Sequence, residues 1–247
     1  MKDLAPIHYF LGIQITQTPK GLILTQAKYA RDILDRAQMS DCKPMGTPMM
    51  AKTKGLISTT PYLDPAHYRN LIGALQYLIL TRPDLVYSVN FVSQFMHSPT
   101  EAHFKMVKCI LRYVKGTVDL GLHFSSNSTL DLYAFSDADW AGCALTRHST
   151  TGYCVFLGSN YISWSSKKQL NVSRSSTKAE YRAMAQTIAE LTWISFLLRD
   201  LSITLHAPPM LLCDNLNALY MTVNSVFHAR SKHIEIDYHY VRERVAL

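Results

Sequence analysis

The sequence lacks three features that would place it in a familiar class of exported or membrane protein. It has no Cys-x-x-Cys pair, no apolar run long enough to span a bilayer and no apolar signal segment at residues 1–6. The five cysteines are odd in number and scattered, which argues against a disulfide framework and a structural zinc site. They are Cys42, Cys109, Cys143, Cys154 and Cys213. We therefore expect reduced thiols in a soluble intracellular protein, cytoplasmic or nuclear, without membrane contact.

Charged residues are also few, at 17% of the 247 residues, while apolar residues make up 48%. This balance is typical of a globular chain that buries a core, not of a disordered one. The net charge of +7 is unevenly spread, because residues 1–130 hold 14 Lys and Arg against 8 Asp and Glu. A basic first half joined to a near-neutral second half favours contact with a polyanion, although many basic surfaces are merely solvated.

The N-terminal region has the alternation of short strands. Residues 7–15 predict one strand, the turn at Pro19-Lys20-Gly21 follows, and residues 22–24 predict a return strand, so an N-terminal β-hairpin is expected. Residues 26–39 then have the apolar spacing of a helix.

The next region is mainly helical by prediction. Residues 40–62 contain several Pro and Gly residues and are expected to form a loop. Three helices are expected at roughly 65–80, 84–97 and 100–115, and Pro83 should end the first of them. The polar segment at residues 124–129 is the best candidate for a boundary, which predicts domains at residues 1–125 and 126–247.

The second half predicts a mixed sheet flanked by helices. A strand at residues 130–139 precedes a hairpin whose strands are expected at 151–157 and 161–164. Apolar residues then recur at steps of three and four over about two dozen residues, which predicts a long helix. They are Tyr181, Met184, Ile188, Leu191, Ile194, Leu198 and Leu201. A strand ending near Asp214 should arrive parallel by crossover, and two further helices should follow it.

Three acids are placed where such folds collect functional groups. Asp137 lies near the end of a predicted strand, Asp214 ends another, and Glu180 lies at the start of the long helix. Like charges ~4 Å apart repel by on the order of 4 kcal/mol at an effective dielectric near 20, and a divalent cation removes that penalty. Hard Mg²⁺ or Mn²⁺ ions prefer such oxygen ligands, so the acids are interpreted as one metal-binding and catalytic cluster. Asp139 ranks below Asp137 because it is a plausible turn residue.

Each acid also has a purely structural explanation. Thr177 and Glu180 have the spacing of a capping box, and Asp214 could cap a helix that starts at Asn215. The neighbouring histidines His228, His233 and His239 lack a cysteine pair and the usual i, i+4 spacing, which disfavours zinc. His228 could assist proton transfer near the cluster.

Basic residues supply candidates for nucleic-acid contact. Four of them lie at helical spacing in the predicted helix 100–115, and three more lie in the loop that precedes the long helix. They are Lys105, Lys108, Arg112 and Lys115, and then Lys167, Lys168 and Arg174. An ordinary solvated helix face explains the first set equally well.

Several short sequence motifs together resemble those of a known family. The second half contains SDADWAG at 136–142, RHSTTGY at 147–153, ISWSSKKQ at 162–169, SRSSTKAEY at 173–181, CDN at 213–215 and KHIE at 232–235. These motifs resemble those of the ribonuclease H domain of copia-type retrotransposon Pol polyproteins. The first half contains MKDLAPIHYFLG at 1–12, TRPD at 81–84 and LRYVKGT at 111–117. These resemble the end of the same family's reverse transcriptase.

The resemblance implies a ribonuclease H-like fold preceded by a thumb- or connection-like region. It also implies cleavage of the RNA strand of RNA–DNA hybrids with two metal ions, held by Asp137, Glu180 and Asp214. Such hybrids are recognised mainly through phosphates and 2′-hydroxyls. Other Pol-derived chains are possible partners.

The sequence also departs from the family pattern. No paired aspartates of a polymerase palm are present, so no polymerase activity is expected, and the chain is expected to be truncated before the helix that carries the family's fourth carboxylate. Glu235 or Asp237 could substitute for it, and Lys178 replaces a commonly acidic residue. Weak or lost cleavage is therefore expected. A non-catalytic nucleic-acid-binding module and an inert transposon relic, destabilised by an open sheet edge, are the alternatives.

Overall fold

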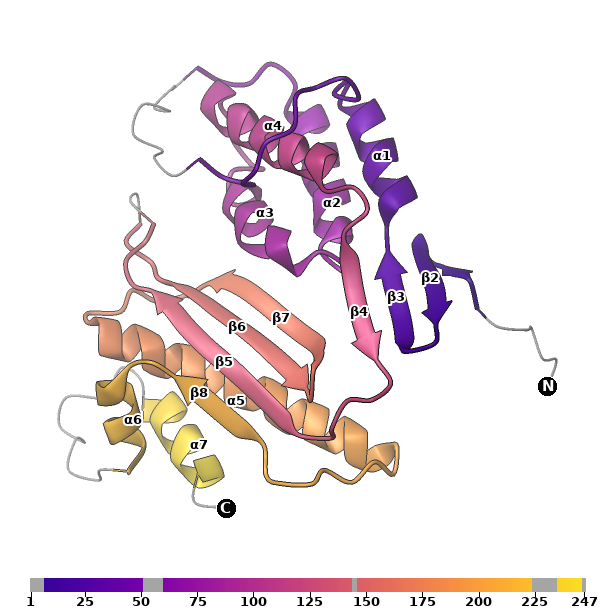
Figure 1. The fold of residues 1–247 in the computed structure, drawn as a ribbon. Coiled ribbons are helices and arrows are strands. Elements are labelled where there is room, and N and C mark those ends of the chain that lie inside the picture. Colours follow the sequence, from indigo (N-terminus) through magenta and orange to yellow (C-terminus); the bar gives the residue numbers. More distant parts are fainter. Residues whose placement is uncertain (1–6, 51–59, 144–145, 224–234, 246–247) are drawn as a thin grey trace. The chain divides into compact units, whose positions relative to one another are not determined.

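The computed structural model describes residues 7–50, 60–143, 146–223 and 235–245. The chain is a mixed α/β protein that divides into two compact units, Met1–Ser126 and Asn127–Leu247 (Figure 1). Each unit contains one four-stranded sheet. None of the helices in the described ranges is both long and apolar enough to cross a membrane.

The sheet of the first unit is antiparallel and has the order β1-β2-β3-β4. Its strands are β1 (Tyr9–Phe10), β2 (Ile13–Thr18), β3 (Gly21–Thr25) and β4 (Gly121–Ser125). The prediction of one strand over residues 7–15 was wrong, because Leu11 and Gly12 have φ angles of 46° and 76° and reverse the chain between β1 and β2. The prediction of a simple hairpin was also incomplete, since β4 pairs with β3 from about 100 residues away.

Helices form the rest of the first unit. They are α1 (Ala27–Arg36), α2 (Pro65–Leu78), the 3₁₀ turn Pro83–Leu85, α3 (Val86–Ser93) and α4 (Glu101–Gly116). Asp64 caps α2 by accepting a hydrogen bond from the His67 amide, and Pro65 occupies the first helical position. The helix predicted at 84–97 is shorter, since regular helix ends at Ser93.

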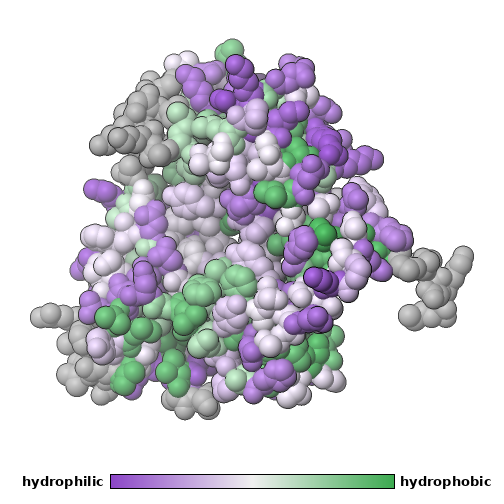
Figure 2. Space-filling model, in the orientation of Figure 1, coloured by the Kyte–Doolittle hydropathy of each residue, from purple (hydrophilic) through white to green (hydrophobic). Residues whose placement is uncertain are grey.

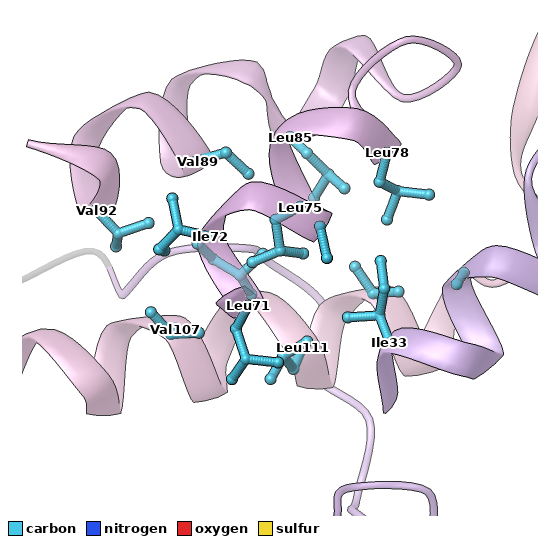
Figure 3. Packing of buried hydrophobic residues seen from close by; sticks show 14 of the residues in the cluster. Ile33, Leu71, Ile72, Leu75, Leu78, Leu85, Val89, Val92, Val107 and Leu111 are labelled. Carbon is cyan, nitrogen blue, oxygen red and sulfur yellow. The ribbon is translucent and has the colours of Figure 1, made fainter. Parts of the chain in front are cut away.

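The core of the first unit is a continuous apolar cluster between these helices (Figure 3). Ile33 of α1, Leu71 and Leu75 of α2, Val89 of α3 and Leu111 of α4 are at most 1% exposed. Side chains spaced by three and four residues place one face of each helix in this core.

The sheet of the second unit has the order β7-β6-β5-β8. Its strands are β5 (Leu132–Asp139), β6 (Thr150–Leu157), β7 (Asn160–Lys168) and β8 (Met210–Cys213). The first three are antiparallel, and β8 runs parallel to β5 as predicted for a crossover connection. Side chains alternate along β5, so that Leu132, Ala134, Ser136 and Ala138 are buried while Phe135, Asp137 and Asp139 are exposed.

Helix α5 (Ser176–Asp200) covers one face of this sheet (Figure 1). The predicted apolar stripe of α5 is buried from Tyr181 to Leu198, but Leu201 follows the helix and is 61% exposed. Helices α6 (Leu216–Val223) and α7 (Glu235–Val245) pack against α5 and each other. Of the face predicted for the last helix, Tyr238 and Val241 are buried and Val245 is 56% exposed.

The opposite face of the second sheet is partly apolar at its surface. Phe135 of β5 is 45% exposed, and Met210 and Leu212 of β8 are 53% and 37% exposed. Green patches are visible over this sheet in Figure 2. Tyr133, Phe135 and Phe156 form a group of ring contacts on the same face, with centroids 5.3–6.1 Å apart.

Candidate active site and its family

Asp137 and Asp214 lie at the same end of two neighbouring parallel strands. In the register of β5 and β8, Ser136 faces Cys213, and each aspartate is the next residue in its chain. Hydrogen-bonded strands lie ~4.8 Å apart, so the two aspartates begin from adjacent backbone positions. Both are exposed.

Glu180 approaches this strand end from the second turn of α5. Its side chain is only 6% exposed, and Oε1 accepts a hydrogen bond from the Ala138 amide at 3.2 Å. The other carboxylate oxygen, Oε2, is buried without a hydrogen-bond partner. An unpartnered buried carboxylate oxygen is costly, and it is the donor that a bound cation would satisfy.

The electrostatics of Glu180 reflect both burial and its acidic neighbours. Burial raises the pKa of Glu180 to about 7, the charges of Asp137 and Asp214 add to this effect, and the Ala138 hydrogen bond opposes it. At neutral pH without a cation, Glu180 is therefore close to half protonated. A buried carboxylate whose pKa is raised by neighbouring acids is typical of functional sites, including those that hold a divalent ion.

The two capping explanations are wrong. Ser175 is the N-cap of α5, since its hydroxyl accepts a hydrogen bond from the Lys178 amide, so Thr177 and Glu180 do not form a capping box. Asn215, and not Asp214, accepts a hydrogen bond from the Ala218 amide in the first turn of α6. Neither Glu180 nor Asp214 is therefore needed to cap the start of a helix.

One group of possible metal ligands occurs in the part of the chain that the structure describes. It consists of Glu180, Cys213 and Asp214, whose ligand atoms all lie within 4.8 Å of one another. Asp137 is not a member of this group, although its charge acts on Glu180. The sequence interpretation had treated Cys213 as one more buried thiol, and its position directly before Asp214 was the signal that could have identified it.

Gln169 connects the end of β7 to the start of α5. Its buried amide nitrogen donates hydrogen bonds to Thr151 Oγ1 and Ala179 O, and its amide oxygen accepts one from Ser173. Because Ala179 directly precedes Glu180, this network fixes the helix turn that carries the acid. Sequence reasoning did not single out Gln169.

Two basic cavities that share one wall lie in the same unit. The first, of about 380 Å³, is lined by Arg174, Lys178 and Arg182, and the second, of about 410 Å³, adds Trp140 and Arg147. Both contain Val172, Ser173 and Arg174. Only Arg174 among the basic lining residues was a predicted contact residue.

The other predicted basic residues differ in their surroundings. On α4, Lys105, Lys108 and Lys115 are exposed, whereas Arg112 donates a hydrogen bond to Lys43 O at 2.8 Å and is partly buried. Lys108 also lies over the Phe104 ring at 4.9 Å. On β7, Lys167 is exposed and Lys168 Nζ lies 3.3 Å from Cys143 Sγ.

The remaining candidates contribute little to this geometry. Asp237 lies 3.9 Å from Arg182, which ties it to the basic side of α5. His239 is exposed, while His228, His233 and the side chain of Glu235 lie outside the described residues.

Comparison with known proteins is consistent with the resemblance of the sequence motifs to copia-type Pol polyproteins. A family model described as "Reverse transcriptase (RNA-dependent DNA polymerase)" matches residues 1–51. The chain is 51% identical over 246 residues to the "Retrovirus-related Pol polyprotein from transposon RE1" of Arabidopsis thaliana, a match that covers 99% of this chain and 17% of the relative. It is 60% identical over 195 residues to the "Uncharacterized mitochondrial protein AtMg00810" of the same plant, covering 79% of this chain and 81% of the relative. The chain belongs to the same family as this mitochondrial protein, and it is similar over nearly its whole length to one part of the Pol polyprotein.

A Pol polyprotein from another plant is also similar. The "Retrovirus-related Pol polyprotein from transposon TNT 1-94" of Nicotiana tabacum is 37% identical over 256 residues, which cover 99% of this chain and 19% of the relative. The chain thus spans about a fifth of the length of the Pol polyproteins it matches. No solved structure matches it.

Proposed function

We propose that the second unit is a ribonuclease H-like domain that hydrolyses the RNA strand of RNA–DNA hybrids with two divalent ions, at a weak or residual rate. The observation that carries this proposal is the unpartnered, buried Oε2 of Glu180 beside Asp137 and Asp214. The relation to reverse transcriptase-containing polyproteins supports a substrate of this class.

The acids fit hard divalent ions. Asp137, Glu180 and Asp214 would hold Mg²⁺ or Mn²⁺, because these ions prefer carboxylate oxygens and neutralise the repulsion that raises the pKa of Glu180. When bound, such a pair of ions activates a water molecule and stabilises the leaving oxygen of a phosphodiester. Glu180 is held by the Ala138 amide, whereas Asp137 and Asp214 are exposed and therefore accessible to a nucleic acid.

The basic residues that line the two cavities support binding of the hybrid. Arg174, Lys178 and Arg182 surround one cavity, and Lys178 lies only two residues before Glu180. Such side chains suit phosphate contacts, which position a duplex without reading its sequence. Lys105, Lys108 and Lys115 of the first unit offer a second set of exposed cations.

One feature favours a low rate. Among the described residues, the group of possible metal ligands contains two carboxylates, those of Glu180 and Asp214. Asp237 is engaged with Arg182 instead of joining them.

A fluorescent RNA–DNA hybrid assay with Mg²⁺ or Mn²⁺ tests this proposal. We expect slow cleavage that Asp137→Asn, Glu180→Gln and Asp214→Asn each reduce by at least about tenfold, a loss of ~1.4 kcal/mol of transition-state stabilisation. Asp139→Asn is the matched control, because Asp139 is an exposed acid at the end of the same strand. Equal cleavage by wild type and Asp137→Asn would refute the assignment.

A non-catalytic hybrid-binding module is the second candidate, and the basic cavities favour it. This function predicts binding with steep salt dependence and no cleavage with either ion. An inert relic, by contrast, would show no cooperative thermal melting of the purified chain.

A further inference from the structure

Cys213 occupies an unusual place for a thiol. It ends β8 between the apolar interior and the acid cluster, and it packs against the group that contains Tyr181 and Met221. Its Sγ lies within 4.8 Å of carboxylate oxygens of both Glu180 and Asp214. A cysteine that served only as a small apolar residue would gain nothing from two carboxylates at this distance.

Glu180 provides an independent indication of a ligand. Its side chain is 94% buried, and Oε2 has no hydrogen-bond partner although Oε1 has one. Glu180 belongs to the same group as Cys213, so the group contains a buried acid with an unsatisfied oxygen next to a cysteine sulfur. Hard ions leave a sulfur ligand unused, whereas thiophilic ions such as Zn²⁺ and Cd²⁺ bind both sulfur and carboxylate oxygen.

We propose that Glu180, Cys213 and Asp214 form a mixed thiolate–carboxylate site for thiophilic divalent ions, and that an ion bound there competes with Mg²⁺ or Mn²⁺ for the acids. The ion forms a bond to Cys213 Sγ, the thiol proton passes to solvent, and the thiolate and the two carboxylates together offset the two positive charges of the ion. Bonds of about 2.0 Å to oxygen and about 2.3 Å to sulfur hold tetrahedral ligands ~3.5 Å apart, so side-chain rotations close the group around one ion and leave a fourth position for water.

The binding half of this inference is independent of the nuclease proposal, while the competition half rests on it. Binding is therefore measured first and without nucleic acid. Cd²⁺ is titrated into the full chain while the ultraviolet charge-transfer absorption of the cadmium–thiolate bond is followed. We expect saturation at one ion per chain and a loss of this band in Cys213→Ser. Cys154→Ser is the matched control, because Cys154 is also partly buried on a strand of the same sheet.

The affinity of the variants separates the ligands. Cys213→Ser and Glu180→Gln should each weaken Cd²⁺ binding by at least about tenfold, since each removes one ligand. An undiminished charge-transfer band in Cys213→Ser would place the bound ion at another cysteine and overturn the inference.

A measurement on the wild-type chain avoids dependence on variant folding. Zn²⁺ is added before alkylation with iodoacetamide, and modification of each cysteine is read by mass spectrometry. Selective protection of Cys213 is expected, and equal labelling of Cys213 with and without Zn²⁺ would contradict the site.

The competition is tested by cleavage of the hybrid in Mg²⁺ with increasing Zn²⁺. The Zn²⁺ concentration for half inhibition should rise at least about tenfold in Cys213→Ser, each protein being compared with its own zinc-free rate. If the chain binds Cd²⁺ through Cys213 but does not cleave the hybrid, the nuclease proposal fails and the metal site stands. If the chain cleaves the hybrid but binds Cd²⁺ without Cys213, the metal site proposed here fails and the nuclease proposal stands.

Discussion

The Glu180 carboxylate accepts a hydrogen bond from the Ala138 amide, 42 residues earlier in the chain. This bond joins the start of α5 to the end of β5. Because Ala138 directly follows Asp137, it also places Glu180 close to Asp137 in the chain fold. A buried acid is thereby held next to two exposed ones, and burial together with their charges raises its pKa to about 7. The burial of this acid beside two others destabilises the fold in the absence of a cation.

Glu180→Gln should therefore stabilise the chain in the absence of metal. The folded-state pKa is raised above the ordinary 4.5, so wild-type stability is fully present below about pH 4.5 and falls as the pH rises to about 7. The variant lacks this loss. Its free energy of unfolding should therefore exceed that of the wild type by up to about 3 kcal/mol at pH 8 and equal it near pH 4. Urea unfolding at both pH values, with EDTA present, measures the difference. Glu243→Gln, an exposed change on α7, should show no such pH-dependent gain.

Gln169→Ala should destabilise the second unit by about 1–3 kcal/mol, because it leaves Thr151, Ser173 and the Ala179 carbonyl without their partner in a buried network. Gln169→Glu should also be harmful, since the carboxylate cannot donate to Ala179 O. Denaturant midpoints report both effects. Gln186→Ala, on a less buried position of α5, is the control, and equal midpoints for the two alanine variants would contradict the role given to Gln169.

Arg82→Lys should destabilise the first unit by about 2–4 kcal/mol. Arg82 is 2% exposed, forms two hydrogen bonds with Asp84 and donates to the carbonyl and hydroxyl of Thr117. Lysine cannot reproduce this planar set of donors. Thermal melting measures the loss, and Arg69→Lys on α2, where the arginine is exposed, should change it little.

The same ion pair predicts a loss of stability in acid. Although burial of Asp84 acts in the opposite direction, the hydrogen bonds and charge of Arg82 hold the pKa of Asp84 below its usual 3.8. The pair therefore stabilises the fold above that value, and this contribution disappears as the pH falls through the lower folded-state pKa. The stability difference between wild type and Asp84→Asn, followed by urea unfolding, should shrink over this acidic range. A constant difference would show that the charge of Asp84 does not matter.

Two glycines should respond to alanine in opposite directions. Gly21 has a φ of 146°, and a Cβ there would collide with the Phe124 carbonyl across the β3–β4 pair, so Gly21→Ala should destabilise the sheet by at least about 1 kcal/mol. Gly73 is an exposed residue of α2 with no atom near its Cβ position, and Gly73→Ala should add about 0.5–1 kcal/mol. Melting temperatures that move in the same direction would contradict this account.

Periodic patterns predicted the regular parts of the fold well. The three- and four-residue spacing from Tyr181 to Leu198 gave the buried face of α5, because one turn of helix repeats that spacing whatever the neighbours are. Strand β4 escaped prediction because its partner β3 lies about 100 residues away, and only pairing along the whole of β3 makes that short segment a strand. The turn at Leu11 and Gly12 was missed for a similar reason, since an apolar run continues through it.

The amino-acid sequence alone indicated the similarity to transposon Pol polyproteins, the acids that could hold metal and the helical and strand periods around them. Tertiary structure alone decided that Glu180 is buried with one unsatisfied oxygen, that caps at Ser175 and Asn215 leave Glu180 and Asp214 available, and that Cys213 joins the acids. Local sequence sets backbone preference, but burial and the distance between remote side chains depend on the path of the whole chain. The chemistry of this site depends on those two quantities.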